Sequence, residues 1–314
     1  MTSPGHGDLF ADDVLLTDGG IETVLLFHEG IDLPAFAAFP LVDDEKGRDA
    51  LRRYYTDYLL LAVGAGRGFV LETPTWRANP DWGALLGYSA EDLRRVNHDS
   101  VALAQGLRAE WTGDGRVLIS GCIGPRGDGY VPGVAMTAIQ AADYHRPQVR
   151  ALAEGGADLV TAFTLSYVDE AIGLVDTAGE AGIPAVIGFT VETDGRLPSG
   201  TPLGEAIELV DSATASSAAW FMINCAHPEH VLASLPPRVE PWLSRIGAYR
   251  ANASRMSHAE LDEAEALDEG DPQDLATGYL ALRQRLPALR VLGGCCGTDV
   301  RHVAAVSSAW GTSA

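Results

Sequence analysis

The sequence predicts an α/β protein, and more narrowly a (β/α)8 barrel of the TIM-barrel architecture, forming a single domain over residues 1–314. Short, nearly continuous apolar runs alternate with segments of helical periodicity, which is the pattern of a parallel sheet buried on both faces. Eight such runs can be counted in the 314 residues, and that number favours a closed barrel over an open doubly wound sheet.

Each element follows from its local pattern. The apolar runs end in Gly, Asp, Thr or Asn, as strands do before turns, and they cover residues 14–20, 68–73, 116–121, 157–162, 184–191, 218–224, 245–249 and 289–293. Helical periodicity predicts helices over residues 49–65, 90–110, 138–154, 167–181 and 203–213. The strongly acidic segment 257–272 interrupts the alternation, and we interpret it as a solvated face or loop.

Composition limits the classes of function. With 46% hydrophobic residues the chain can bury a full core, while its net charge of -21 argues against nucleic acid or an anionic membrane as a partner. No apolar run approaches the roughly 20 residues that a membrane-spanning helix needs, and no secretory signal is visible. Four cysteines in such a chain predict a cytoplasmic, reducing location, where thiols serve metals or chemistry more often than disulfides.

Three of the cysteines follow predicted strands. Cys225 comes after the run 218–224, and the adjacent Cys295 and Cys296 follow the last run. Adjacent cysteines do not readily bond to each other, because the small ring strains the disulfide. In a barrel all three would lie at the C-terminal rim, where barrel enzymes place their active sites. Three thiolates would leave one corner of a zinc tetrahedron open, as in catalytic sites, although buried apolar thiols remain the alternative.

Two of the motifs are specific when they occur together. Asn224-Cys225 and Gly293-Gly-Cys-Cys-Gly297, with Asp18-Gly-Gly20 and Gly121-Cys-Ile-Gly-Pro125, resemble the homocysteine S-methyltransferase family over nearly the whole chain. The resemblance implies a zinc-dependent barrel enzyme, of EC 2.1.1 type, in which Cys225, Cys295 and Cys296 bind Zn2+. It also implies small-molecule partners, namely a thiol acceptor and a methyl donor, and we expect a monomer or homodimer.

The implied reaction moves a methyl group from a sulfonium or ammonium donor to a zinc-bound thiol, with homocysteine giving methionine. A free thiol has a pKa of about 8.5, so little of it is nucleophilic at neutral pH, and zinc would deprotonate it. The leaving group departs neutral, so the protein would need positioning more than acid catalysis. No sequence motif indicates which methyl donor is used.

Several residues are candidates for substrate binding. By the resemblance, Asp18 is the catalytic and substrate-binding residue that holds the amino-acid end of homocysteine, with Gly19 and Gly20 allowing close approach, although Asp-Gly-Gly could also be a simple turn. The other candidates are Glu22, then Glu72 and Thr73 at the end of the second run, and Asn224, which would orient the loop carrying Cys225.

One position departs from the family pattern. Many members carry a glutamate at the end of the fourth strand that binds the substrate ammonium, and here Phe163 stands in its place. An unpaired buried ammonium is costly, so Glu22, Glu72 or Glu192 replaces that partner, or the acceptor is a different thiol. The Phe163 ring could also hold a cation by a cation-π contact worth roughly 0.5 to 2 kcal/mol.

The remaining candidates and rival functions are weaker. Cys122 and His145 are interpreted as core side chains, His227 as a possible substrate contact, and Trp76, Trp82 and Tyr130 as loop aromatics near the site. A Schiff-base aldolase needs a lysine at a strand end, whereas the single lysine, Lys46, lies in an acidic run. A zinc hydrolase would favour histidine and carboxylate ligands. A non-catalytic zinc or redox-sensing thiolate protein stays open as the alternative outside enzymology.

Overall fold

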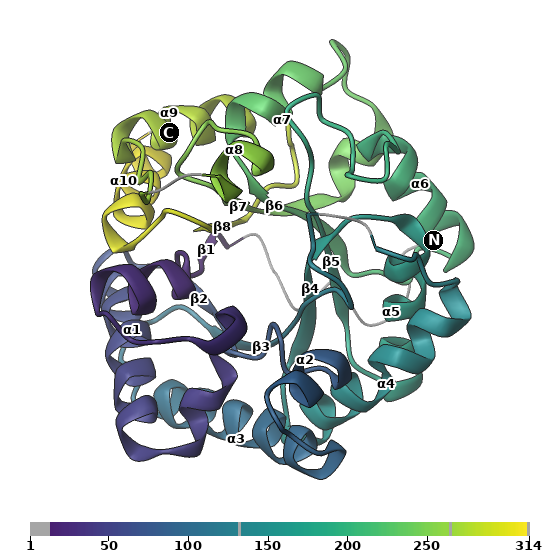
Figure 1. The fold of residues 1–314 in the computed structure, drawn as a ribbon. Helices are drawn as coiled ribbons and strands as arrows, with labels where there is room; N and C mark the ends of the chain where they lie inside the picture. Colours follow the sequence, from purple (N-terminus) through teal and green to yellow (C-terminus); the bar gives the residue numbers. More distant parts are fainter. Residues whose placement is uncertain (1–12, 131–132, 264–265, 313–314) are drawn as a thin grey trace.

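The computed structural model describes residues 13–130, 133–263 and 266–312. Eight parallel strands pair in sequence order and close between the last strand and the first, and helices form the outer ring (Figure 1). The predicted (β/α)8 barrel is therefore confirmed. The strands are β1 (Leu15–Leu16), β2 (Gly68–Glu72), β3 (Val117–Ile123), β4 (Leu159–Leu165), β5 (Ala185–Phe189), β6 (Trp220–Ala226), β7 (Ile246–Ala251) and β8 (Val291–Gly294).

The helices surround this sheet, and short 3-10 or π turns lie between several elements. The α-helices of the described residues are α1 (Glu45–Gly64), α2 (Pro80–Leu85), α3 (Ala90–Ala109), α4 (Ala138–Gly155), α5 (Val168–Ala181), α6 (Leu203–Ala213), α7 (Pro228–Ser234), α8 (His258–Asp262), α9 (Pro272–Arg283) and α10 (Val300–Thr312). The short turns are η1 (Thr23–His28), η2 (Pro34–Phe36), η3 (Phe39–Asp43) and η4 (Pro241–Arg245). No helix in the described ranges is both long enough and apolar enough to cross a membrane.

Capping residues explain why two predicted helices agree closely with the structure. The side chains of Ser89 and Thr137 each accept a hydrogen bond from the backbone amide three residues later. The side chains of Asp92 and Gln140 in turn accept from the backbone amides of Ser89 and Thr137. The first strand is shorter than predicted, with only Leu15–Leu16 in the ladder. The chain after it turns toward the loop that follows β8, because the Gly20 amide donates to the Thr298 carbonyl at 3.1 Å.

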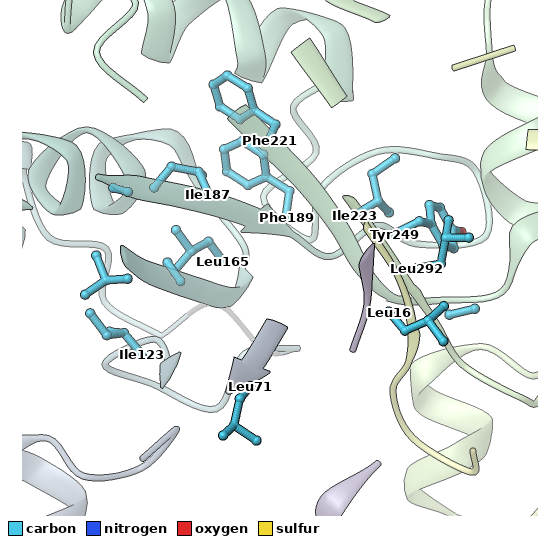
Figure 2. Packing of buried hydrophobic residues seen from close by; sticks show 14 of the residues in the cluster. Leu16, Leu71, Ile123, Leu165, Ile187, Phe189, Phe221, Ile223, Tyr249 and Leu292 are labelled. Carbon is cyan, nitrogen blue, oxygen red and sulfur yellow. The ribbon is translucent and has the colours of Figure 1, made fainter. Parts of the chain in front are cut away.

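Apolar side chains fill two layers. One cluster lies inside the barrel and includes Val70, Phe163 and Ala248, and the larger cluster lies between the sheet and the helices (Figure 2). Because strand side chains alternate between faces, Glu72 and Arg250, two residues after Val70 and Ala248, share the inner face with them. Two charged side chains therefore enter the top of an otherwise apolar barrel interior.

The acidic segment 257–272 is more structured than predicted. It begins with α8, which Ser257 and Glu260 stabilise with a capping box. Leu261 and Leu267 line the main cavity, so this part of the segment is not the purely solvated loop that its charge suggested. The prediction was based on the charge of the segment. Its two leucines instead lie against the cavity, where apolar side chains are favoured over solvent.

Candidate active site

The main cavity lies over the C-terminal ends of the strands and has a volume of about 390 Å³. Ten of the residues singled out in the sequence as metal or substrate ligands line it: Asp18, Gly19, Gly20, Glu22, Glu72, Thr73, Phe163, Cys225, Cys295 and Cys296. They come from β1, β2, β4, β6 and β8 and the segments that follow these strands. Sequence positions far apart thus converge on one cavity of the size that small molecules occupy.

The three cysteines form a possible metal site. The sulfur atoms of Cys225, Cys295 and Cys296 lie within 4.8 Å of one another. Cys225 and Cys295 are joined as a disulfide, with 5.4 Å between their Cα atoms, while Cys296 is free and exposed. The sequence led us to expect three free thiols. The structure differs because the two chain segments approach within the separation that a disulfide spans.

A bulge in β6 carries Cys225 to this position. The pairing with β7 shifts register between Asn224 and Ala226, and Cys225 adopts a left-handed backbone conformation with φ of 54°. Asn224 donates from Nδ2 to the Cys225 sulfur at 3.2 Å, and its Oδ1 accepts from the amide of Thr164 at 3.0 Å. Asn224 is absent from the cavity lining, so these contacts fit the orienting role and not direct substrate contact.

Tyr130, from the loop after β3, approaches the free cysteine. Its hydroxyl lies 3.7 Å from the Cys296 sulfur, and its ring lies 4.3 Å, centre to centre, from that of His258. The His258 Nε2 lies 2.8 Å from the carbonyl oxygen of Cys225. One loop aromatic noted in the sequence therefore contacts the cysteine cluster, and His258, which sequence reasoning missed, supports it.

Asp18 is held by the protein itself. Its Oδ1 lies 2.7 Å from Nη1 of Arg250, and its Oδ2 accepts from the Tyr54 hydroxyl at 2.8 Å. Arg250 also donates to the hydroxyl of Thr17 at 2.9 Å and the carbonyl of Gly294 at 2.8 Å. Burial alone would lower the pKa of Arg250, but the carboxylates of Asp18 and Glu72 raise it, so the guanidinium stays charged.

The two glycines after Asp18 allow the chain to pack against itself. A Cβ at Gly20 would stand 2.6 Å from the Cys295 carbonyl oxygen, and one at Gly19 would stand 2.7 Å from the Tyr58 hydroxyl. The two glycines were expected to let the chain approach the substrate. In the structure they let it approach the loop that carries Cys295 and its neighbours. Thr73 is similarly occupied, since its hydroxyl accepts from the amide of Cys122 at 3.0 Å.

The ring of Phe163 packs against the guanidinium group of Arg250. The guanidinium carbon of Arg250 lies 5.1 Å from the centre of the Phe163 ring. The cation-π contact considered for a ligand is thus made by Arg250, within the usual range of about 6 Å. Arg250 was missed in the sequence, although an arginine next to the apolar run 245–249 is a signal, because buried arginines are rare without partners.

Two carboxyl groups of the cavity have a raised pKa. Burial raises the pKa of Glu22 to about 7, against the effect of a backbone hydrogen bond. Burial also raises the pKa of Glu72 to about 8, although Arg250 and hydrogen bonds from Ser120 and Thr161 oppose the rise. A cation bound beside either carboxyl group would offset the cost of burying its ionised form and would lower its pKa.

Of the remaining candidates, Cys122 and Trp76 line the cavity, whereas His145, His227 and Trp82 do not. Cys122 lies in the apolar cluster inside the barrel, and the buried His145 lies 2.9 Å from Glu170, as expected for core residues. His227 caps α7 by accepting from the Glu229 amide at 3.3 Å and does not line the cavity, so a substrate contact is not supported. Trp76 lines the cavity, whereas Trp82 packs on Arg77 outside it.

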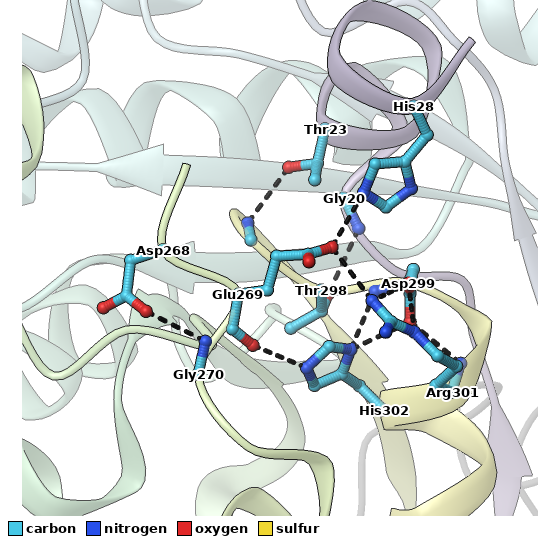
Figure 3. A network of polar contacts seen from close by, with 11 residues as sticks. Gly20, Thr23, His28, Asp268, Glu269, Gly270, Thr298, Asp299, Arg301 and His302 are labelled. Carbon is cyan, nitrogen blue, oxygen red and sulfur yellow. Dashed lines mark hydrogen bonds and ion pairs between the residues drawn. The ribbon is translucent and has the colours of Figure 1, made fainter. Parts of the chain in front are cut away.

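Behind the cysteine loop, a polar network joins three segments (Figure 3). Asp299, at the start of α10, accepts from Nε of Arg301 at 2.7 Å and lies 2.9 Å from Nδ1 of His302. Glu269 bridges Arg301 at 2.9 Å and His28 of η1 at 2.8 Å. The network fixes the loop after β8, which carries Cys295 and Cys296, against η1.

Asp299→Asn is expected to lower the free energy of unfolding by about 1–3 kcal/mol at pH 7, because charge-assisted hydrogen bonds are lost. Burial would raise the pKa of Asp299, but the hydrogen bonds from His302 and Arg301 outweigh it and hold the pKa well below the usual range. The contribution is therefore complete above the ordinary carboxyl pKa of about 4 and is lost as the pH falls through the lowered pKa. Urea unfolding of both proteins from pH 7 to pH 3 should show the difference shrinking; a constant difference would contradict this account.

Comparisons with known proteins agree with these features. The family model described as homocysteine S-methyltransferase matches residues 15–310. A homocysteine S-methyltransferase of Escherichia coli K12 is 27% identical over 98% of this chain and 99% of its own length. Homocysteine S-methyltransferase YbgG of Bacillus subtilis is 25% identical over 84% of each chain.

Solved structures share the fold. The oxidised form of the homocysteine methyltransferase MmuM of Escherichia coli superposes with a TM-score of 0.75 at 23% identity, covering 98% of this chain and 99% of that one. Its metallated form gives a TM-score of 0.72 at 23% identity, covering 94% and 96%. Since the family model spans nearly all of the described residues, the chain belongs to the homocysteine S-methyltransferase family and is a methyltransferase.

Proposed function

We propose that this chain binds Zn2+ through Cys225, Cys295 and Cys296 and transfers a methyl group from a sulfonium or ammonium donor to the thiol of homocysteine, giving methionine. The observation that carries the proposal is the convergence of three cysteine sulfurs, within 4.8 Å of one another, on a cavity of about 390 Å³. The named relatives support the choice of homocysteine.

The residues present fit zinc. Among the residues that the structure describes, no fourth His, Cys, Asp or Glu joins the cysteine group, so three thiolates would leave one position for a substrate, as in catalytic sites. Sulfur ligands also favour zinc over magnesium or calcium. Reduction of the Cys225–Cys295 disulfide has to precede metal binding, because the thiolate is the metal ligand. When bound, zinc would hold the acceptor sulfur as a thiolate at neutral pH.

The surrounding residues bind and orient the two substrates. Trp76 and Tyr130 give the cavity aromatic walls, which attract sulfonium and ammonium groups. Glu22 and Glu72 add carboxyl groups that favour a cation when ionised. In the transfer, the acceptor sulfur forms a bond to the methyl carbon while the donor's bond to that carbon breaks, and the electron pair leaves with the donor, which becomes neutral. The protein's contribution is to hold the two reactants in line.

The test is a methyl-transfer assay on reduced protein loaded with zinc and freed of excess metal. Homocysteine is offered with S-methylmethionine, S-adenosylmethionine or betaine, and mass spectrometry follows the gain of one methyl group on sulfur. We expect methionine with at least one donor, and none from protein whose disulfide is left intact. Release of zinc on mild oxidation with no transfer from any donor would instead support a redox-sensing protein.

A further inference from the structure

A buried carboxylate oxygen in the cavity lacks a partner. Glu72 ends β2, is only 7% exposed and lines the cavity. Within the described part of the chain, its Oε2 has no hydrogen-bond partner. A buried acceptor left unsatisfied is costly and is rare in native proteins, so a ligand that donates hydrogen bonds is the natural complement.

The nearby positive charge does not satisfy this oxygen. Arg250 directs its N–H groups to other acceptors, namely Asp18, Thr17, Gly294 and the carbonyl of Gly19. Asp18 is therefore neutralised, whereas Glu72 keeps its burial cost and a pKa of about 8. A cationic ligand with N–H groups would supply both the missing charge and the missing hydrogen bonds.

A second free acceptor lines the same cavity. Asn252, just after β7, is 3% exposed, and its Oδ1 also lacks a partner among the described residues. Its Nδ2 donates to the carbonyl of Cys225 at 3.1 Å, which fixes the orientation of the amide and places Asn252 beside the cysteine cluster. Asn252 therefore offers the cavity a further hydrogen-bond acceptor, close to the cysteine cluster, for a ligand that carries donors.

The fourth strand offers no such acceptor. Phe163 occupies the inner face of β4, and the guanidinium of Arg250 already stands over its ring. A second cation on that face would lie close to the charge of Arg250 and be repelled by it. Arg250 also acts on Glu72, but the Glu72 carboxyl supplies a countercharge that Phe163 lacks, so an ammonium is better placed on the β2 side of the cavity than on β4.

We propose that Glu72 accepts the α-ammonium of an amino-acid thiol, so that this chain recognises the amine through β2 instead of β4. The proposal rests on the function proposed above, since it concerns the acceptor of that reaction. In this proposal Glu72 determines which thiols bind, by recognising the amine, and the three cysteines hold the metal that binds the acceptor sulfur.

The test compares homocysteine with 4-mercaptobutanoate, which has the same thiol and carboxylate but no amine. Calorimetric titration of reduced, zinc-loaded protein measures both affinities. Glu72→Gln should weaken homocysteine binding at least about 30-fold, as for loss of one partner of a buried charge pair, and change 4-mercaptobutanoate binding by less than about threefold. Glu192→Gln, a change of a carboxylate that does not line the cavity, should keep the preference for homocysteine.

Wild-type protein provides a measurement that does not depend on a variant. Glu72 is largely protonated at pH 7 when its pKa is about 8, so pairing with an ammonium should release close to one more proton for homocysteine than for 4-mercaptobutanoate. Titrations in two buffers of different ionisation enthalpy count these protons. Equal proton release, or a preference for homocysteine that Glu72→Gln leaves unchanged, would overturn the assignment. If neither thiol bound the wild type, the proposed function itself would fail.

Discussion

Cys296→Ser is expected to reduce the zinc affinity of the reduced protein at least about 100-fold, because even partners one shell outside a metal change affinity by 10–100-fold. Cys296 is the exposed, unpaired member of the cysteine cluster, so its removal disturbs neither the disulfide partners nor a packed core. Methyl transfer should fall with the metal. Affinity can be measured by competition with a chromophoric chelator, and retained zinc by elemental analysis after dialysis.

Cys122→Ala is the matched control. Cys122 is also a free cysteine, but it is buried in the apolar cluster inside the barrel. The change should cost about 1 kcal/mol of stability and leave zinc stoichiometry near that of the wild type. If Cys296→Ser kept the wild-type zinc affinity, the three-cysteine site would be wrong.

Arg250→Met is expected to lower the free energy of unfolding by about 3–5 kcal/mol, because it leaves Asp18 as a buried charge without its partner. Arg250 is 5% exposed and Asp18 is 2% exposed, so solvent cannot replace the lost ion pair. The same change removes hydrogen bonds that join β7 to the ends of β1 and β8. Urea unfolding followed by circular dichroism measures the effect.

Arg52→Met serves as the comparison. Arg52 pairs with Glu110 at 3.1 Å, but both side chains are exposed, so the change should cost less than about 1 kcal/mol. Asp18→Asn combined with Arg250→Met should recover part of the loss, since the double variant buries no unpaired charge. Equal losses from Arg52→Met and Arg250→Met would show that burial of the pair does not matter.

The barrel could be predicted from the sequence because its signals are local. Apolar runs of strand length, separated by helical periodicity, identify parallel strands without knowledge of their partners. The helix starts at Ala90 and Ala138 follow from the capping residues just before them. The extent of β1 was wrong, since its end depends on contacts with the loop after β8.

The cysteine cluster could be predicted because barrel topology places all strand ends at one rim. The partner of Asp18 could not, since Arg250 lies on β7 and no local pattern links the two residues. The predicted strand ended at Tyr249, one residue before Arg250, so the charge was not recognised as buried. Phe163 was noticed as a departure, but its contact with Arg250 depends on the three-dimensional packing of β4 and β7. The pairing of Cys225 with Cys295 depends on redox state, which sequence does not encode.

The bulge at Cys225 limits where such a cluster can be transplanted. Neighbouring strands lie about 4.8 Å apart, so β6 and β8, with β7 between them, are separated by about 10 Å in a regular sheet. The Cα atoms of Cys225 and Cys295 are nevertheless 5.4 Å apart, at the point where β6 departs from regular pairing and Cys225 adopts a left-handed backbone conformation. Cysteines grafted at the same strand positions of an idealised barrel would stand too far apart to share one ion. A designer who wants this chemistry on another scaffold must copy the backbone irregularity together with the side chains.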